Sequence, residues 1–371
     1  MVMVRHANKC LKPFQIHHQS PCLYVLLAVY RIASLPTICF SRLPQLAVMH
    51  HRLHKKPLIS TPIALAANEM RRGHAMRLIL NFFDNDSHLR YLEYRALSRT
   101  ITAAWIVRTD RHKQVNRMKI MPLTADERRV LSDYRVALER LGESDLSLAA
   151  ASLFRPHELR PFLAKAQDVL KAPDLRTAAS IFAKRYGYLL TVPAFYSFSV
   201  WNKSLQLHSD RLYLEPSDSE EHWLPRLGVP DTVTVPESAA ERELLRDTLI
   251  QAVFADHLHP LWSLLSETAS ISKQVLWENT AIYLYWLYET LLHSDLPEDV
   301  MKRVREDLDY VLHADFRLFG TAQKQPLAKF YTDKRQVDDQ LIRIRQTCCL
   351  TYMASGSYCK SCPKACHVLQ S

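Results

Sequence analysis

Glycine is scarce in this chain, because only 6 of its 371 residues are glycine, against a usual share of about 7%. Turn-rich all-β folds depend on glycine at their turns, so the scarcity favours a helical fold. No glycines occur in the G-x-G-x-x-G or G-x-x-x-x-G-K patterns of nucleotide-binding loops. The sequence therefore predicts a mainly α protein and excludes a Rossmann or P-loop nucleotide site.

Long hydrophobic runs are also missing. The run from Cys22 to Tyr30 has nine residues and stops at Arg31, whereas a transmembrane helix needs about 20 apolar residues. Basic residues precede this run, but no small-residue cleavage site of the A-x-A type follows it. We therefore expect no membrane span and no secretory signal, so that any membrane association would be peripheral.

Positive charge is confined to the first third of the chain. The whole chain carries a net charge of +10, but residues 1–117 hold 18 Lys and Arg against 5 Asp and Glu, and the remainder holds 30 against 33. Residues 1–117 are either a basic arm for membrane or nucleic acid, or poorly ordered sequence translated from a start site chosen too early. We favour the second interpretation, with Met118 or Met121 as initiator, and we expect no nucleic-acid partner.

From residue 123 onward, helix signals become regular. Thr124 and Glu127 form a capping-box pattern for a helix to about residue 141. The alternating leucines of Lys203 to Glu215 predict a short β-hairpin. The fold class is therefore mainly α, or α+β with a short β-hairpin. Apolar spacing, caps and glycine or proline stops predict further helices at 147–154, 156–170, 175–188, 238–266 and 297–313. Gly187 is expected to end the third of these, Pro297 lies in the first turn of the last, and Ser270 or Ser272 caps one more helix that runs to Leu291.

Two groups of side chains in the predicted helices look structural. His257 and His259 lie two residues apart, so they point away from each other and are not a helical pair of metal ligands. We interpret them as core or surface histidines. An aromatic set is interpreted mainly as core, with a ligand groove as the lesser alternative; it comprises Trp277, Tyr283, Tyr285, Trp286 and Tyr288. No convincing Ser/His/Asp arrangement occurs, so catalytic residues stay unknown.

The cysteines gather at the C-terminal end. Three are scattered near the start, and five fall in the last 24 residues, with Cys348 and Cys349 adjacent and Cys359-x-x-Cys362-Pro after a nine-residue spacer. Four thiolates this close can enclose a metal centre. Adjacent cysteines point to opposite faces of an extended chain, so a shared centre needs a bent backbone or a large group. The spacing alone leaves iron–sulfur and zinc both open.

Several motifs together resemble the FhuF-type ferric-siderophore reductases. The C-terminal signature is Thr347-Cys-Cys-Leu-x-Tyr352 followed by Tyr358-Cys-x-x-Cys-Pro363. The resemblance covers about residues 118–371. It departs from the family in the nine-residue spacer, in Gln325 before Pro-Leu and in the extra thiol of Cys366. The supporting segments are Phe254 to Leu261, Val275 to Asn279, Leu318 to Gly320 and Pro326-Leu327.

The resemblance implies that a 2Fe–2S cluster is bound by Cys348, Cys349, Cys359 and Cys362. It implies a helical siderophore-binding domain at 118–325 and a cluster-binding segment at 326–371. The implied activity is one-electron reduction of a ferric siderophore, with the hydroxamate type favoured, in the cytoplasm or on the inner face of the cell membrane. Implied partners are an electron donor protein or small reductant, and a peripheral contact with the membrane or a siderophore transporter.

Three charged residues beside the cysteines, Arg343, Arg345 and Lys360, could raise the cluster potential or attract an anionic chelate; solvated surface charge is the equal alternative. Two other functions also stay open. One is an iron–sulfur electron carrier or sensor without a siderophore substrate. The other is a structural module stapled by zinc.

Overall fold

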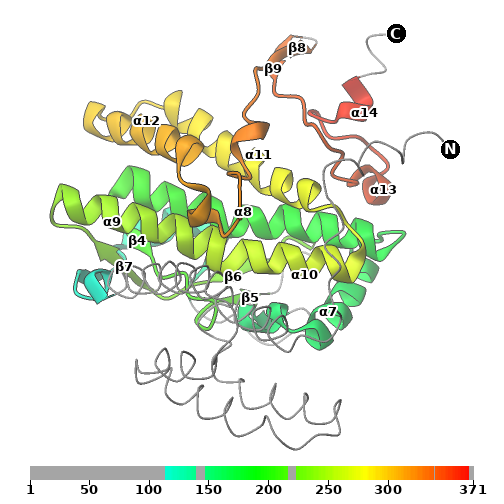
Figure 1. Cartoon of the computed structure of the whole chain (residues 1–371), viewed down its shortest axis with the longest axis horizontal. Helices are drawn as coiled ribbons and strands as arrows, with labels where there is room; N and C mark the ends of the chain where they lie inside the picture. Colours follow the sequence, from blue (N-terminus) through cyan, green and yellow to red (C-terminus); the bar gives the residue numbers. More distant parts are fainter. Residues whose placement is uncertain (1–112, 139–146, 216–222, 338, 367–371) are drawn as a thin grey trace, which may run out of the picture. The chain divides into compact units, whose positions relative to one another are not determined.

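Two long helices form the centre of the fold because they are apolar on most sides. Helix α8 (Leu175–Trp201) and helix α11 (Lys273–Leu292) lie side by side and make the largest helix–helix contact (Figure 1). The computed structural model describes residues 113–138, 147–215, 223–337 and 339–366. These lie within the unit 108–371, and almost all of the segment 1–117 falls outside the described residues.

Further helices pack around this central pair. One continuous helical stretch consists of α9, a π-helical segment and α10, and α12 lies along α8 and α11. The mainly α class is therefore confirmed, and none of the helices in the described part of the chain is long and apolar enough to cross a bilayer. The bounds are α6 Ala125–Asp133, α7 Pro156–Val169, α9 Ala239–Ile250, the π segment Gln251–Leu258, α10 His259–Ala269 and α12 Glu298–His313.

Small sheets complete the fold. One has the order β1-β7-β4, a second has the order β2-β6-β5-β3, and β8 with β9 forms a separate hairpin. The only parallel pair among the described strands is β2 with β6. The bounds are β1 Lys119–Pro122, β2 Val136–Ala137, β3 Leu148–Ala149, β4 Ser204–Leu205, β5 Tyr213–Glu215, β6 Arg226–Gly228, β7 Thr232–Val235, β8 Arg335–Val337 and β9 Gln340–Ile342.

The predicted hairpin at 203–215 has the right strands but the wrong pairing. Its first arm, β4, pairs with β7, and its second arm, β5, pairs with β6 and β3, so the two arms belong to different sheets. Leu205 and Leu214 are both buried. Alternation indicates only that one face of each strand is buried. Pairing with a strand from another part of the chain buries that face equally well.

Two helix ends also differ from prediction. Helix α6 ends at Asp133 because Arg135 adopts a left-handed backbone (φ 64°) and the chain continues into β2. Helix α8 does not stop at Gly187 but runs to Trp201. Gly187 instead lies at the contact with α11, where a Cβ atom would be 3.1 Å from Oγ1 of Thr280. Its missing side chain lets two helices approach closely rather than ending one.

Other local predictions are confirmed. Thr124 and Glu127 form the capping box at the start of α6. The Ser272 hydroxyl accepts the Gln274 N–H at the start of α11, and α12 begins directly after Pro297.

The helix predicted at residues 147–154 is wrong. These residues form the strand β3 and a short 3-10 helix at Ala150–Phe154.

Candidate metal centre

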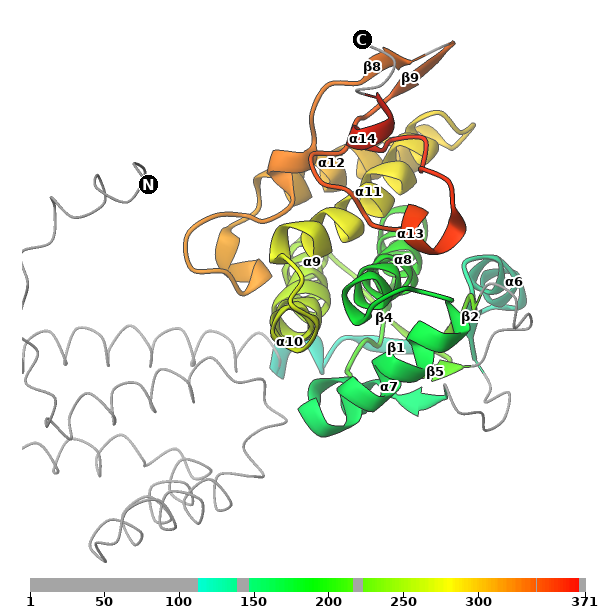
Figure 2. The same cartoon turned by 90° about the vertical axis from the view of Figure 1, so that its right-hand side faces the viewer.

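The cysteines lie on a segment that returns to the central helices after the β8–β9 hairpin. This cysteine segment (residues 343–366) passes over α8 and α11 and contains two single-turn helices, α13 (Tyr352–Ser355) and α14 (Pro363–Cys366). Figures 1 and 2 show α13 beside α8 and α11. A hydrogen bond of 2.8 Å from the Ser180 hydroxyl on α8 to the Cys349 carbonyl oxygen joins the two parts.

The four predicted ligands come together as two pairs of thiols. The sulfurs of Cys349 and Cys359 are 3.9 Å apart, and those of Cys348 and Cys362 are 4.0 Å apart. We call these the Cys349 pair and the Cys348 pair. Two sulfurs bound to one tetrahedral metal at about 2.3 Å are about 3.8 Å apart. Each pair therefore has the spacing of two ligands on one metal.

A bend in the backbone sends the adjacent cysteines to different partners. Leu350 adopts a left-handed conformation (φ 60°), which is costly for a residue with a side chain, and its N–H donates to the Cys348 sulfur at 3.4 Å. The second motif is a tight turn, since the Cys362 N–H donates to the Cys359 carbonyl at 3.0 Å. The bent backbone and the tight turn expected from the spacing are both present.

The two thiol pairs match the way in which a group with two metals takes its ligands. A mononuclear zinc site would need all four thiols around one point, whereas a dinuclear cluster takes two thiols at each of its metals. The residues present therefore fit a 2Fe–2S cluster.

Buried polar side chains of α11 hold the segment before the cysteines. The Glu278 carboxylate, 2% exposed, accepts the backbone N–H groups of Gln346 at 2.6 Å and Thr347 at 2.7 Å, and the Thr347 hydroxyl as well. A buried carboxylate needs such donors. Burying even a neutral polar group without a hydrogen-bond partner costs about 2–7 kcal/mol, and burying a charge costs more. Glu278 thus sets the position from which the cysteine loop starts.

A second chain of hydrogen bonds runs from α8 through α11 to the cysteine segment. The Asn279 amide donates to the Ser180 carbonyl at 3.0 Å, and its oxygen accepts Nη2 of Arg345 at 2.6 Å. Nε of Arg345 donates to the Thr347 carbonyl at 3.0 Å. Glu278 and Asn279 lie in the segment Val275 to Asn279 that carries part of the resemblance, but no site role was predicted for them or for Ser180. Buried polar residues on largely apolar helices were the available signal.

The three flanking cations take different places. Arg345 is 4% exposed and its Nη2 lies 3.7 Å from Oε2 of Glu278, whereas its Nη1 finds no hydrogen-bond partner among the described residues. Arg343 turns away and pairs with Glu289 at 2.5 Å. Lys360 is exposed. Surface charge is therefore the wrong description for Arg345, because the chain buries its guanidinium against the hydrogen-bond chain described above.

The two thiols of the Cys349 pair shift each other's pKa in opposite directions. The pKa of Cys349 is lowered, chiefly because the neighbouring Cys359 thiol donates to the Cys349 thiolate, and the charges of Lys184 and Arg345 add to this. The pKa of Cys359 is raised for the same reason, with burial adding to it. Burial also raises the pKa of Cys348. One thiolate in the pair is favoured, and metal binding would also require Cys359 and Cys348 to lose their protons.

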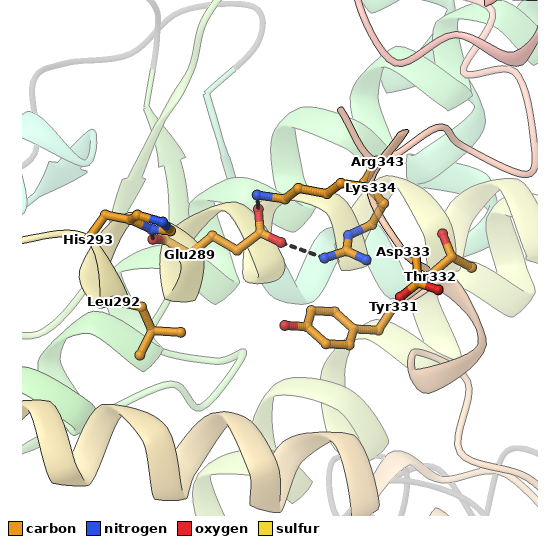
Figure 3. A pocket seen from close by; sticks show the side chains of 8 residues that line it. All are labelled: Glu289, Leu292, His293, Tyr331, Thr332, Asp333, Lys334 and Arg343. Carbon is orange, nitrogen blue, oxygen red and sulfur yellow. Dashed lines mark hydrogen bonds and ion pairs between the residues drawn. The ribbon is translucent and has the colours of Figure 1, made fainter. Parts of the chain in front are cut away.

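A pocket of about 320 Å³ lies away from the thiols, at the base of the hairpin. Its central acid is Glu289, which is neutralised by Lys334 at 2.8 Å and by Arg343 (Figure 3). It contains no cysteine, and its one histidine, His293, bonds through its ring to the Glu289 carbonyl. Its central charges already neutralise one another.

The two histidines lie in the core and at its edge, as interpreted, whereas the aromatic set is only partly buried. His257 is buried and its Nε2 lies 2.7 Å from the Tyr186 hydroxyl, while His259 lies beside the Trp277 ring. Burial lowers the pKa of His257 to about 3. Of the aromatic set, Tyr285 and Tyr288 are buried and Trp286 is 46% exposed.

Residues 180–333 match the model of a family described as a ferric iron reductase FhuF-like transporter. The match begins at Ser180 and includes Glu278 and Asn279, the residues that hold the cysteine segment. It ends before Cys348, so the thiols lie outside the matched range. No curated protein matches the chain.

Proposed function

We propose that this chain, which carries a FhuF-like ferric iron reductase domain at residues 180–333, reduces ferric siderophores by one electron. Its four ligands would be Cys348, Cys349, Cys359 and Cys362, holding a 2Fe–2S cluster. The observation that carries the proposal is the spacing of the two thiol pairs, 3.9 and 4.0 Å, on a segment anchored to the matched domain. The family name supports ferric iron as the species reduced.

The reaction is a single electron transfer. One electron from a donor protein or small reductant passes to the Fe(III) of the chelate, giving Fe(II) and free siderophore. Siderophores are hard oxygen chelators, whose affinity for the softer Fe(II) is far lower, so reduction releases the metal. A 2Fe–2S cluster supplies one electron at a time. Electron transfer needs no general acid or base, which is consistent with the lack of a convincing Ser/His/Asp arrangement in the sequence.

The surroundings of the thiols suit a bulky substrate. Cys348 and Cys359 are half-buried, and on the same loop Met353 is 40% and Tyr358 49% exposed. A ferric chelate could therefore approach the loop from solvent without entering a deep pocket. We favour hydroxamate siderophores, with the reaction in the cytoplasm and peripheral contact with the membrane or a siderophore transporter. The domain division at 118–325 and 326–371 stays a prediction.

The experiment is anaerobic purification of the full chain, reduction with dithionite and an EPR spectrum, followed by addition of a ferric trihydroxamate. We expect iron and sulfide in the purified protein, a one-electron EPR signal, and reoxidation that produces one Fe(II) per electron. Cys359→Ser should lose the iron–sulfur absorbance, whereas Cys366→Ser, at a thiol outside the proposed ligand set, should retain it.

Each alternative gives a different result. A colourless protein that contains zinc and no EPR signal would establish the structural zinc module and overturn the proposal. A reducible cluster that ferric trihydroxamates do not reoxidise would leave an electron carrier or sensor. Full absorbance in Cys359→Ser would remove that residue from the ligand set.

A further inference from the structure

Positive charge is concentrated in the part of the fold that carries the cysteines. Residues 324–366 hold 8 Lys and Arg against 3 Asp and Glu, whereas residues 118–323 hold 22 against 30. Residues 340–366 contain no Asp or Glu at all. In Figures 1 and 2, the β8–β9 hairpin, α13 and α14 lie on the same side of α8. The proposed ligands therefore lie in a basic part of a fold whose remainder is acidic.

Two acids of α11 neutralise the inner cations of this basic part. Glu278 lies 3.7 Å from the buried Arg345, and Glu289 pairs with Lys334 at 2.8 Å and with Arg343. The outer cations are exposed, so solvent and a binding partner can reach them. These cations are Lys324, Lys329, Arg335, Lys360 and Lys364, and the exposed acids of the same segment, Asp333 and Asp339, both precede the cysteines.

Exposed aromatic and apolar side chains accompany the outer lysines at the cysteine loop. The rings of Tyr352 and Tyr358 lie 4.6 Å apart, and Tyr358 directly precedes Cys359. Nζ of Lys364 donates to the Tyr352 hydroxyl at 3.1 Å, which holds the ammonium group at the loop. Met353 is 40% and Tyr358 49% exposed. We define the loop face as Tyr352, Met353, Tyr358, Lys360 and Lys364.

The favoured substrate does not account for the charge of the loop face. Each hydroxamate group carries one negative charge, so three of them cancel the charge of Fe(III) and the iron–hydroxamate core is neutral. Coulomb attraction needs charge on both partners. A protein that docks briefly to pass on an electron does benefit, because complementary charge raises the rate of encounter and such interfaces are small and weak.

We propose that the loop face is the docking site of the electron donor, and that this donor is an acidic one-electron carrier protein. The inference rests on the proposed function, since it requires a cluster on the four cysteines. The reduced donor loses one electron, the cluster gains it, and the oxidised donor dissociates before the ferric chelate reaches the same loop. Lys360 and Lys364 pair with carboxylates of the donor, and the exposed ring of Tyr358 supplies apolar contact.

The test measures how fast a reduced, acidic plant-type ferredoxin reduces the full chain, by stopped-flow mixing at several salt concentrations. The double variant Lys360→Gln/Lys364→Gln removes two charges from the loop face. The matched control, Lys119→Gln/Lys302→Gln, removes two charges from β1 and α12, where the side chains are 55% and 74% exposed. Both variants therefore have the same net charge. Photoreduced deazaflavin, a neutral small reductant, reports any effect on the cluster itself.

The measured quantity is the rate with ferredoxin divided by the rate with deazaflavin. At low salt we expect this ratio to fall at least tenfold in the loop-face variant, because electrostatic steering raises encounter rates by about 10- to 1,000-fold. In the control variant it should stay within about twofold of the parent. Added salt should slow the parent steeply and the loop-face variant only slightly, since salt screens charges on the surface.

Several results would overturn the docking site. They are an equal fall of the ratio in both variants, equal slowing of the loop-face variant with both reductants, and a parent that deazaflavin reduces but ferredoxin does not. With ferredoxin rates unchanged in the loop-face variant, slower reoxidation by a ferric tricatecholate would assign the lysines to an anionic chelate. Weaker binding to phosphatidylserine vesicles would then assign them to a membrane surface.

The failure of this inference is distinguishable from failure of the proposed function. In each of those results the parent chain contains a reducible cluster, and the proposed function stands. A parent chain purified without iron and sulfide would instead end the proposed function itself.

Discussion

The Nη2 atom of Arg345 donates a hydrogen bond of 2.6 Å to the Oδ1 atom of Asn279, and both side chains are almost fully buried. Arg345 belongs to the cysteine segment and Asn279 to α11. The same amide group donates to Ser180, whose hydroxyl donates to the Cys349 carbonyl. One asparagine thereby connects the guanidinium, α8 and the backbone of a proposed ligand.

Replacing Asn279 should loosen the metal centre. Asn279→Ala leaves a buried guanidinium with one acceptor fewer, and we expect a loss of about 2–3 kcal/mol in the free energy of unfolding. Iron content per chain should fall with it. Urea unfolding and iron analysis test both effects. Gln274→Ala, at an exposed position of the same helix, is the control and should change neither; an unaltered Asn279→Ala protein would contradict the anchoring role.

Glu278→Gln should free the start of the cysteine segment. The neutral amide keeps one oxygen acceptor but loses the charge that strengthens the bonds from Gln346 and Thr347, which we expect to cost about 1.5–3 kcal/mol. Limited proteolysis should cut residues 343–366 faster than in the parent. The control is Glu267→Gln, at an exposed position of α10 that is not bonded to the cysteine segment in any described contact. Equal cleavage rates in the two variants would count against this role of Glu278.

Gly187→Val should weaken the contact between α8 and α11. Even a Cβ atom would be 3.1 Å from Oγ1 and 3.3 Å from the Cα atom of Thr280, so a branched side chain must push the helices apart. We expect a loss of about 1–3 kcal/mol, measured by chemical denaturation. Gly356→Ala has open space around it and should cost only about 1–2 kcal/mol, through its left-handed backbone (φ 73°). Wild-type stability in Gly187→Val would show that the crossing is not tight.

Acid should destabilise the protein through His257. Burial lowers its pKa from 6.5 to about 3, so the folded state holds the ring neutral while the unfolded state takes up a proton. The stability due to this difference is complete above pH 6.5 and is lost progressively as the pH falls toward 3. Between pH 7 and pH 5 the loss is about 2 kcal/mol.

Urea unfolding at the two pH values measures this loss. His257→Gln should show a smaller difference between them, even though it loses packing at both. His313→Gln, at an exposed position, should keep the full difference. A His257→Gln protein with the parental pH dependence would assign the effect to another group.

Local signals in the sequence predicted local structure well. The capping box at Thr124, the cap at Ser272 and Pro297 before α12 all act within one helical turn, so the interactions that they report are between near neighbours. Long-range pairing was beyond the same signals. The leucines of 203–215 show that both strands are buried, but nothing in their alternation distinguishes a hairpin from two strands in separate sheets.

Gly187 illustrates the same limit. A glycine followed by an apolar run and a proline resembles a helix end, because glycine and proline both disfavour helix. The helix continues through it since packing against α11 outweighs a propensity cost of about 1 kcal/mol.

The sequence by itself determined the mainly helical class and the gathering of cysteines near residue 350, because composition and spacing carry that information. Only the tertiary structure decided which thiols pair, and that Arg345 is buried against Asn279 while Arg343 faces a separate pocket. The left-handed turn at Leu350 and the hydrogen bonds of Ser180, Glu278 and Asn279 hold this arrangement. The packing of α8 against α11 brings these three residues to partners that lie 66 or more positions away in the sequence.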